Sequence, residues 1–421
     1  MTAVPDRDAA LEPARRRARR ALAAGVALGS TGHIAAVTVA TIVAKDLIGS
    51  DALAGLPGAT VVLGAATGAV LLSSLMARRG RRPGLVAGYG IGVIGALVAT
   101  AAILVRSFEL LLVGTTLIGF GNAANQLSRY AAADMVPPAR RASAIGMVVW
   151  GGTVGSVIGP WLVPIATVMA IGVGLPGLAG PYLVPVVFVG AAALLSLRML
   201  RPDPYELADT TPDEMAAAID AAGADSDPIR AILRRPAIVA ALMALVVGQI
   251  TMTLIMTMTP LHMTEHGHDL AAVGLVLSGH TLGMYAFSPV SGWLTDRVGR
   301  LQTIYLGTVV LAVSAVMTIV APPEGGLILP TGMFLLGLGW SFAYVGGSAL
   351  LSDHLELHER TRVQGVADAM IWSAAAAASL GSGLIVAAAG YAALGVLGLG
   401  LVVIAVLVIT RNRASATAAR A

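Results

Sequence analysis

The chain has 421 residues, of which 57% are hydrophobic and only 12% are charged, whereas soluble domains usually carry about 25% charged residues. This composition excludes an ordinary soluble domain. The formal net charge is +4, but the basic residues border the apolar stretches, which excludes a nucleic-acid-binding surface. The chain contains no cysteine, which excludes disulfides, thiolate metal sites and thiol redox chemistry.

Long apolar stretches recur along the whole chain, and each is close to the roughly 20 residues that a helix needs to cross a bilayer. Backbone polar groups in lipid must be satisfied internally, and the alternating pattern of a membrane barrel is absent. The sequence therefore predicts an all-α membrane protein with twelve transmembrane helices. The expected spans are residues 21–45, 54–76, 84–105, 110–132, 143–171, 181–199, 236–261, 270–294, 304–321, 327–351, 364–389 and 391–410.

The placement of positive charge predicts the orientation of these spans. With twelve spans, all lysines and arginines except Lys45 and Arg106 fall on or beside one side, which the positive-inside rule identifies as cytoplasmic. We therefore expect an inner-membrane protein with both termini in the cytoplasm. The acidic stretch near its middle predicts a solvated linker with a short helix near 212–222. The expected division is a tail (1–20), a six-helix half (21–200), the linker (201–235), a second six-helix half (236–410) and a tail (411–421).

The first span contains His33 near its middle, beside Thr31 and Gly32. Ionisable groups inside a membrane are costly. His33 is therefore either a neutral side chain satisfied by a helix backbone or hydroxyl, or a residue of the transport cavity that carries protons. The arginines before this span and after the second span are predicted to be topological anchors. They are Arg15, Arg16, Arg17, Arg19 and Arg20, and the arginines within 78–82.

The fourth span carries a polar stripe that ends at Arg129. We expect Asn122 and Gln126 to face the cavity, and Arg129 to pair with Asp134 in closing the cytoplasmic gate. The remaining member of this fourth-span stripe is Asn125.

In the eleventh span, Asp368 is a candidate proton-binding residue or a partner for the arginines at 360 and 362.

The fifth span contains small residues four positions apart, from Gly151 through Gly155 and Gly159 to Pro160. Such spacing allows two helices to approach closely, and the proline bends the span. The stretch also resembles the fifth-span motif of proton-driven antiporters, although Val163 and the proline after it stand where that motif ends in glycines. Packing and an export function are both compatible with this pattern.

The seventh and eighth spans carry two pairs of soft ligands, Met252 with Met256 and His280 with Met284. Within each pair the spacing is i, i+4, so both side chains share a helix face. Met252 and His280 lie equally far from the outer loop, and at 1.5 Å per residue both fall near the bilayer midplane, where transporters bind cargo. Thioether and imidazole ligands suit Cu(I). His262, His266 and His268 in the outer loop are either a metal-capture mouth or a solvated polar loop.

The loop after the eighth span predicts the family. It reads Gly292-Trp-Leu-Thr-Asp296-Arg297-Val-Gly299-Arg300, and it is similar to the best-known loop motif of the major facilitator superfamily. Asp296 is placed to cap a helix start and to pair with arginines, and Gly299 permits a tight turn. Such a charge cluster would latch the outward-open state. The counterpart after the second span has Ala77 where the acid belongs.

The two halves also resemble each other, as in duplicated transporters. Within the superfamily, the Met252/Met256 and His280/Met284 pairs resemble those of the bacterial copper importers that supply cytochrome oxidase assembly. That resemblance implies a monomeric transporter without a cofactor, with these four residues as direct ligands for imported Cu(I). The alternative is a proton-coupled exporter, or a transporter of a drug-like or riboflavin-like compound. The expected partners are this small-molecule or metal-ion substrate and membrane lipid.

Overall fold

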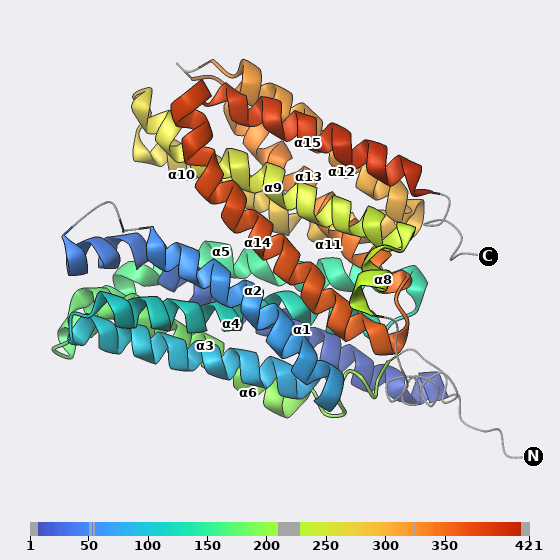
Figure 1. Ribbon diagram of the computed structural model, residues 1–421. Helices are drawn as coiled ribbons and strands as arrows, with labels where there is room; N and C mark the ends of the chain where they lie inside the picture. The colour runs from blue at the N-terminus through green and yellow to red at the C-terminus, as the bar shows by residue number, and fades with distance from the viewer. Residues whose placement is uncertain (1–6, 50–52, 54, 209–227, 323–324, 414–421) are drawn as a thin grey trace, which may run out of the picture.

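The computed structural model describes residues 7–49, 53, 55–208, 228–322 and 325–413, and these residues form helices joined by short connections. Two helical bundles lie against each other, α1 to α6 in one and α9 to α15 in the other (Figure 1). The predicted all-α fold class is thereby confirmed. The helices are α1 (Arg7–Ile48), α2 (Leu56–Arg79), α3 (Arg81–Leu104), α4 (Phe108–Asp134), α5 (Arg141–Gly172), α6 (Gly180–Met199), α8 (Ile229–Leu233), α9 (Pro236–Glu265), α10 (Leu270–Thr281), α11 (Ser288–Val298), α12 (Arg300–Val320), α13 (Ile328–Asp353), α14 (Leu357–Ala389) and α15 (Ala392–Arg411), with short turns η1 (Pro138–Arg140), η2 (Gly177–Ala179) and η3 (Leu282–Ala286).

Within the described chain, ten helices are long and apolar enough to cross a membrane. The two remaining expected spans correspond to α4, which carries the polar stripe, and to the segment formed by α10, η3 and α11. The turn η3 is a π-helical turn that interrupts this eighth span, and such turns occur frequently at functional sites. Many helices extend beyond the predicted spans, because apolar composition marks only the part of a helix that lies in lipid.

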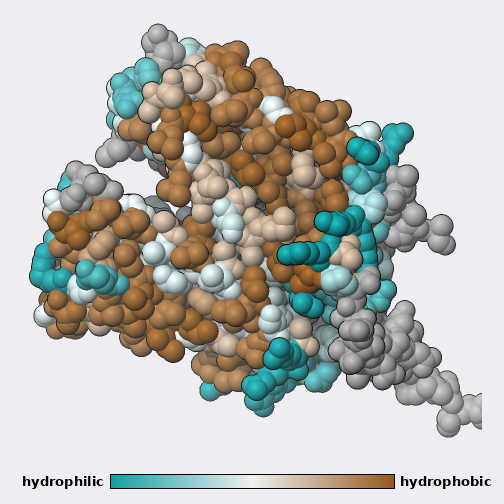
Figure 2. All heavy atoms as spheres, in the orientation of Figure 1, coloured by the Kyte–Doolittle hydropathy of each residue, from teal (hydrophilic) through white to brown (hydrophobic). Residues whose placement is uncertain are grey.

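The two bundles meet at one end of the molecule and diverge at the other (Figure 1). At the end where α8 lies, α2 packs against α14 and α5 packs against α11. We call this the closed end. At the opposite, open end the surface is hollowed between the bundles (Figure 2). Hydrophobic residues cover much of the visible face of both bundles, and hydrophilic residues gather toward the closed end (Figure 2).

Glycines on α5 allow α1 to pack closely against it. A Cβ on Gly155 would overlap Ser30, and a Cβ on Gly151 would overlap the carbonyl oxygen of Ala23. The small residues of the fifth span therefore serve helix packing. Close packing of α5 against α1 explains this glycine pattern without an antiport function.

The first described part of the linker, residues 201–208, is tied to the first bundle. The Asp203 carboxylate accepts hydrogen bonds from the backbone N–H groups of Arg81 (3.0 Å) and Arg82 (2.9 Å), and so caps the start of α3. The short helix expected near 212–222 lies outside the described residues.

Candidate functional site

The acid of the loop motif joins the two bundles at the closed end. Both oxygens of Asp296, at the end of α11, accept hydrogen bonds from the start of α5, at 3.2 Å from the Ala142 nitrogen and 2.8 Å from the Ser143 nitrogen. A carboxylate at a helix N-terminus is stabilised by the free N–H groups and by the helix dipole. Gly299 adopts φ 127° in the turn before α12, a conformation that favours glycine. The predicted capping role of Asp296 is therefore present, across the two halves.

Arg300 extends this contact into a charge network. Its guanidinium lies 3.0 Å from Asp296 and 2.9 Å from Asp353 at the end of α13, and it also donates to the Pro138 carbonyl oxygen in the first half. Asp353 in turn pairs with Arg141 of α5 at 2.8 Å. Arg297 does not join the network, because its guanidinium lies over the exposed ring of Trp293, 5.3 Å from the centroid.

Close backbone contact accompanies these charges. A Cβ on Gly292 of α11 would overlap the carbonyl oxygen of Ala142, and a Cβ on Gly146 of α5 would overlap the carbonyl oxygen of Ser288. The two helices therefore approach more closely than side chains would permit. Gly292 contributes to the closed end by this contact rather than by turn geometry.

A second charge cluster lies between α3, α4 and α14. Arg81 is 1% exposed and lies 2.7 Å from Asp134 and 2.7 Å from the Gln364 side-chain oxygen. Arg360 of α14 lies 3.6 Å from Asp134. The prediction that the arginines within 78–82 are all topological anchors is therefore wrong for Arg81. The sequence alone could not distinguish Arg81 from its neighbours, because its acidic partner comes from another helix.

Arg129 crosses between the halves to Asp368. The two side chains lie 2.5 Å apart at their closest atoms, and both residues are 1% exposed. The expected pairing of Arg129 with Asp134 is wrong, since Arg81 and Arg360 take Asp134 instead. The expected pairing of Asp368 with the arginines at 360 and 362 is also wrong. The reason is that α4 packs against α14 across the interface and brings Arg129 to Asp368.

Aromatic residues that the sequence reasoning missed surround this ion pair. The Arg129 guanidinium lies 4.1 Å from the Tyr130 ring centroid and 4.4 Å from that of Tyr344. Tyr344 stacks on Trp340 at 4.4 Å, and Trp340 meets Tyr285 edge to face at 5.9 Å. A Cβ on Gly152 of α5 would contact the Tyr285 ring, so the row reaches the first half. In the sequence, the i, i+4 spacing of Trp340 and Tyr344 is the signal that could have indicated this aromatic row.

Two amide side chains hold this aromatic row. Tyr344 donates a hydrogen bond to Gln126 of α4 at 2.7 Å, and Trp340 donates one to Gln249 of α9 at 2.9 Å. Gln126 is partly exposed, whereas Asn122, one turn earlier on α4, is buried. The expected cavity position of Gln126 is compatible with its place in this row.

Both soft-ligand pairs lie against α13. The His280 Nδ1 donates to the Met333 carbonyl oxygen at 2.9 Å, and its Nε2 is buried without a hydrogen-bond partner. Met284 is buried in the π-helical turn. On α9, Met252 and Met256 share a face with Gln249, which bonds to α13, and Met252 is buried. His280 and Met284 thus pack on α13, and α9, the helix that carries Met252 and Met256, packs on the same helix.

Two of the outer histidines take part in ring contacts. The ring of His262 lies 4.1 Å from that of Tyr391, nearly parallel, and 4.4 Å from the tilted ring of His266. Among the described residues, no group of three His, Asp or Glu side chains gathers as a metal site. In this conformation His262, His266 and His268 are not gathered as metal ligands, and metal capture by them stays a prediction.

His33 retains an unused polar atom. Its side chain is partly exposed, and its Nδ1 is buried without a hydrogen-bond partner among the described residues. The interpretation that a helix backbone or hydroxyl satisfies this nitrogen is therefore wrong.

The family model described as Major Facilitator Superfamily matches residues 21–272 and 241–420. The uncharacterized MFS-type transporter YdeG of Bacillus subtilis is 38% identical over 390 residues, covering 91% of this chain and 90% of the relative. The riboflavin transporter RfnT of Brucella anthropi is 30% identical over 375 residues, covering 87% and 88%. Neither of these relatives is described as a copper transporter.

Solved structures show the same fold at low sequence identity. The proton:xylose symporter XylE matches with TM-score 0.77 and 13% identity, covering 95% of this chain and 96% of the symporter chain. A bacterial homologue of the iron transporter ferroportin, in an outward-facing state, matches with TM-score 0.73 and 13% identity, covering 94% and 99%. At these identities the likeness concerns the fold alone.

Proposed function

The chain belongs to the Major Facilitator Superfamily, and from that premise we propose that it carries a planar organic molecule across the bacterial inner membrane by alternating access. The halves 21–200 and 236–410 rock about the linker 201–235. Both termini lie in the cytoplasm, so that the closed end faces the cytoplasm. The protein acts as a monomer and needs no cofactor.

The aromatic row is the observation that supports an organic cargo. Tyr285, Trp340 and Tyr344 lie together at the contact between the halves, with the amides of Gln126 and Gln249 bonded to their polar edges. Aromatic faces favour stacking with a planar ring system, and amides bond to its heteroatoms. The 30% identity to a protein named as a riboflavin transporter supports the same substrate class.

Asp368 is the proposed proton-binding residue. Its carboxylate and the Arg129 guanidinium hold α14 to α4. A proton on this carboxylate removes its charge, which weakens the pair and favours separation of the closed end. His33, with its unpartnered Nδ1, is a second proposed proton site. A transport rate that does not change with pH would remove this coupling.

Transport of radiolabelled riboflavin tests the proposed cargo. We expect cells expressing the protein to accumulate riboflavin faster than cells without it, or to lose it faster after preloading, which also gives the direction. Trp340→Ala should abolish the difference, since it removes the centre of the aromatic row. Trp161→Ala is the matched control, because Trp161 is 76% exposed on α5. Equal transport by the Trp340 variant would contradict the proposed site.

Import of Cu(I) is the second candidate, and His280 favours it. The hydrogen bond from Nδ1 to the Met333 carbonyl fixes the ring and leaves the buried Nε2 lone pair available, which is the arrangement of a metal-binding histidine. Met252, Met256 and Met284 would supply thioether ligands from α9 and the π-helical turn.

Accumulation of radiolabelled copper tests this candidate. We expect His280→Gln and Met252→Leu to lower uptake at least several-fold while riboflavin transport stays unchanged. His358→Gln is the control, because His358 lies beside Glu356 at the closed end (3.5 Å). Copper uptake that is the same in the His280 variant and in the control would reject the copper site.

A further inference from the structure

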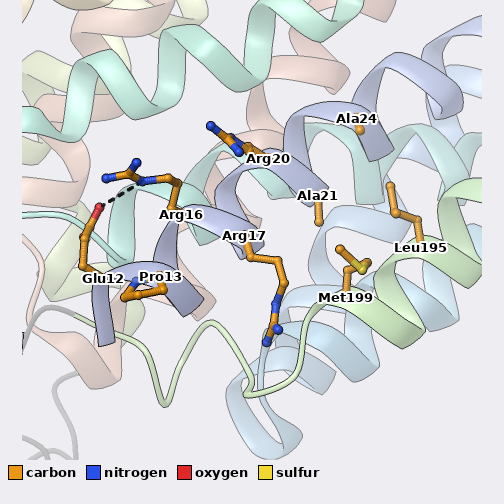
Figure 3. Close-up of a pocket in the computed structure, with 9 residues that line it drawn as sticks. All are labelled: Glu12, Pro13, Arg16, Arg17, Arg20, Ala21, Ala24, Leu195 and Met199. Atoms are coloured by element: carbon orange, nitrogen blue, oxygen red, sulfur yellow. Dashed lines mark ion pairs between the residues drawn. The ribbon is translucent and has the colours of Figure 1, made fainter. Parts of the chain in front are cut away.

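An open surface cavity of about 690 Å³, lined mostly by exposed side chains, lies between the first part of α1 and the end of α6, away from the interface between the halves (Figure 3). Arginines occupy the part of its lining contributed by the start of α1, and apolar side chains occupy the rest. The site takes no part in the proposed transport mechanism. The lining residues that matter here are Glu12, Arg16, Arg17, Arg20, Leu195 and Met199.

The cavity carries an excess of positive charge. Of its three arginines, Arg16 lies 3.9 Å from Glu12, the single acid in the lining. Arg17 donates to the Arg201 carbonyl oxygen, which neutralises no charge. Within the part of the chain that the structure describes, no carboxylate pairs with Arg20. An anion is therefore the complementary ligand.

The apolar wall selects among anions. Leu195 and Met199 stand on the last turns of α6, opposite α1, and Figure 3 shows them beyond Ala21 from the arginines. Arg20 directly precedes the expected start of the first span, so this cavity lies at the level where a bilayer changes from headgroups to acyl chains. A soluble phosphate would leave the apolar wall unused.

We propose that this cavity binds an anionic phospholipid of the cytoplasmic leaflet, with Arg16 and Arg20 at the phosphate and with Leu195 and Met199 against the first part of an acyl chain. The proposal rests on the proposed orientation of the chain and not on the identity of the cargo. Basic side chains near a membrane surface each strengthen binding to anionic lipid. A phospholipid here would tie α1 to α6 at the closed end.

Native mass spectrometry of the purified full chain with added phosphatidylglycerol tests the proposal. We expect a retained lipid adduct in the wild type and roughly tenfold weaker binding in Arg16→Gln/Arg20→Gln, since each basic residue near a membrane contributes roughly fivefold and Glu12 offsets part of this. Met199→Trp, which fills the apolar part without changing charge, should weaken the adduct as well. Phosphatidylcholine should bind no more tightly to the wild type than to the double variant.

The matched control is Arg78→Gln/Arg79→Gln, which removes two exposed arginines from the same side of the protein. It should bind phosphatidylglycerol as the wild type does. Equal binding by the control and by the Arg16/Arg20 variant would overturn the proposal. Displacement of the lipid by glycerol 3-phosphate at similar concentration would overturn it in favour of a soluble anion.

Discussion

Arg129 and Asp368 are each only 1% exposed, so neither charge is hydrated where it lies. Their mutual attraction, the Tyr130 hydroxyl 2.9 Å from Arg129 and the Tyr344 ring replace the lost water. A buried pair of this kind adds little net stability, but removal of one partner leaves the other charge uncompensated. Because the partners belong to different halves, that cost falls on the contact between the halves.

Asp368→Asn is expected to lower the free energy of unfolding by about 3–5 kcal/mol, because Arg129 is left buried without a counter-charge. Thermal unfolding of the purified protein measures this change. The double variant Arg129→Gln/Asp368→Asn should recover most of the loss, and Glu109→Gln at an exposed carboxylate should change little. A single variant as stable as the wild type would show that the pair is not formed in solution.

His262 is expected to make stability at the open end depend on pH. Partial burial, and to a smaller extent the nearby His266, lower the pKa of His262 below its ordinary value of 6.5. The folded protein therefore binds fewer protons than the unfolded chain, and stability rises with pH through this window. Acidification from about pH 7 to about pH 5 should lower the melting temperature, and His262→Gln should reduce that slope. An unchanged slope would contradict this assignment.

At the scale of helices, the starts of α5 and α14 are stabilised differently. No side chain of its own segment caps α5; its first N–H groups bond to Asp296 of the other half. In contrast, α14 has a capping box formed by its own Glu356 and Glu359. This difference explains why the loop after the second span tolerates Ala77 in place of an acid, since α14 needs no cap from the other half.

Asp296→Asn should therefore shift the protein away from the conformation in which the closed end is closed, whereas Glu356→Gln should only destabilise α14 locally. Because the chain has no native cysteine, spin labels at Val173→Cys and Leu327→Cys, near the open end, report the separation of the halves without background. We expect the population with the shorter distance between the two spin labels to increase in Asp296→Asn and not in Glu356→Gln. An equal gain with Glu356→Gln would refute the distinction between the two caps.

On the scale of the whole molecule, the charge clusters of the closed end follow the internal duplication. Arg300 and Asp353 pair within the second half as Arg81 and Asp134 pair within the first. Each acid also receives an arginine from the opposite half, Arg141 for Asp353 and Arg360 for Asp134. Rocking of the halves must break both of these crossing contacts together, which favours two discrete states over a continuum.

Riboflavin, as the proposed type of cargo, is expected to shift this two-state equilibrium. A ligand that stacks on the row from Tyr285 to Tyr344 gains contacts when the two halves come together at the open end. The ligand therefore favours the state in which the open end is shut. The Val173→Cys/Leu327→Cys label pair should then show a larger population at short distance with riboflavin than without. Trp340→Ala should abolish the shift, and a shift that persists in this variant would argue against the aromatic row.

Long apolar stretches predict the helical fold correctly, because a bilayer leaves no alternative to helices for such stretches, whereas the orientation indicated by the placement of positive charge stays a prediction. The loop motif that contains Asp296, Gly299 and Arg300 can also be recognised in the local sequence, but the helix that Asp296 caps, α5, belongs to the other half. Apolar stretches and a short motif require no knowledge of which helices become neighbours.

Partners that come from distant helices required the tertiary structure. Asp368 meets Arg129 rather than the nearer arginines of its own helix, and Arg81 is buried rather than an exposed anchor. The aromatic row takes its members from α13 and from the π-helical turn, and its amides from α4 and α9. The chain itself therefore determined an all-helical membrane protein with a charged loop motif, while the packing of the helices decided which helix start Asp296 caps and which buried charges and rings meet, because each buried polar group must find its partner in three dimensions.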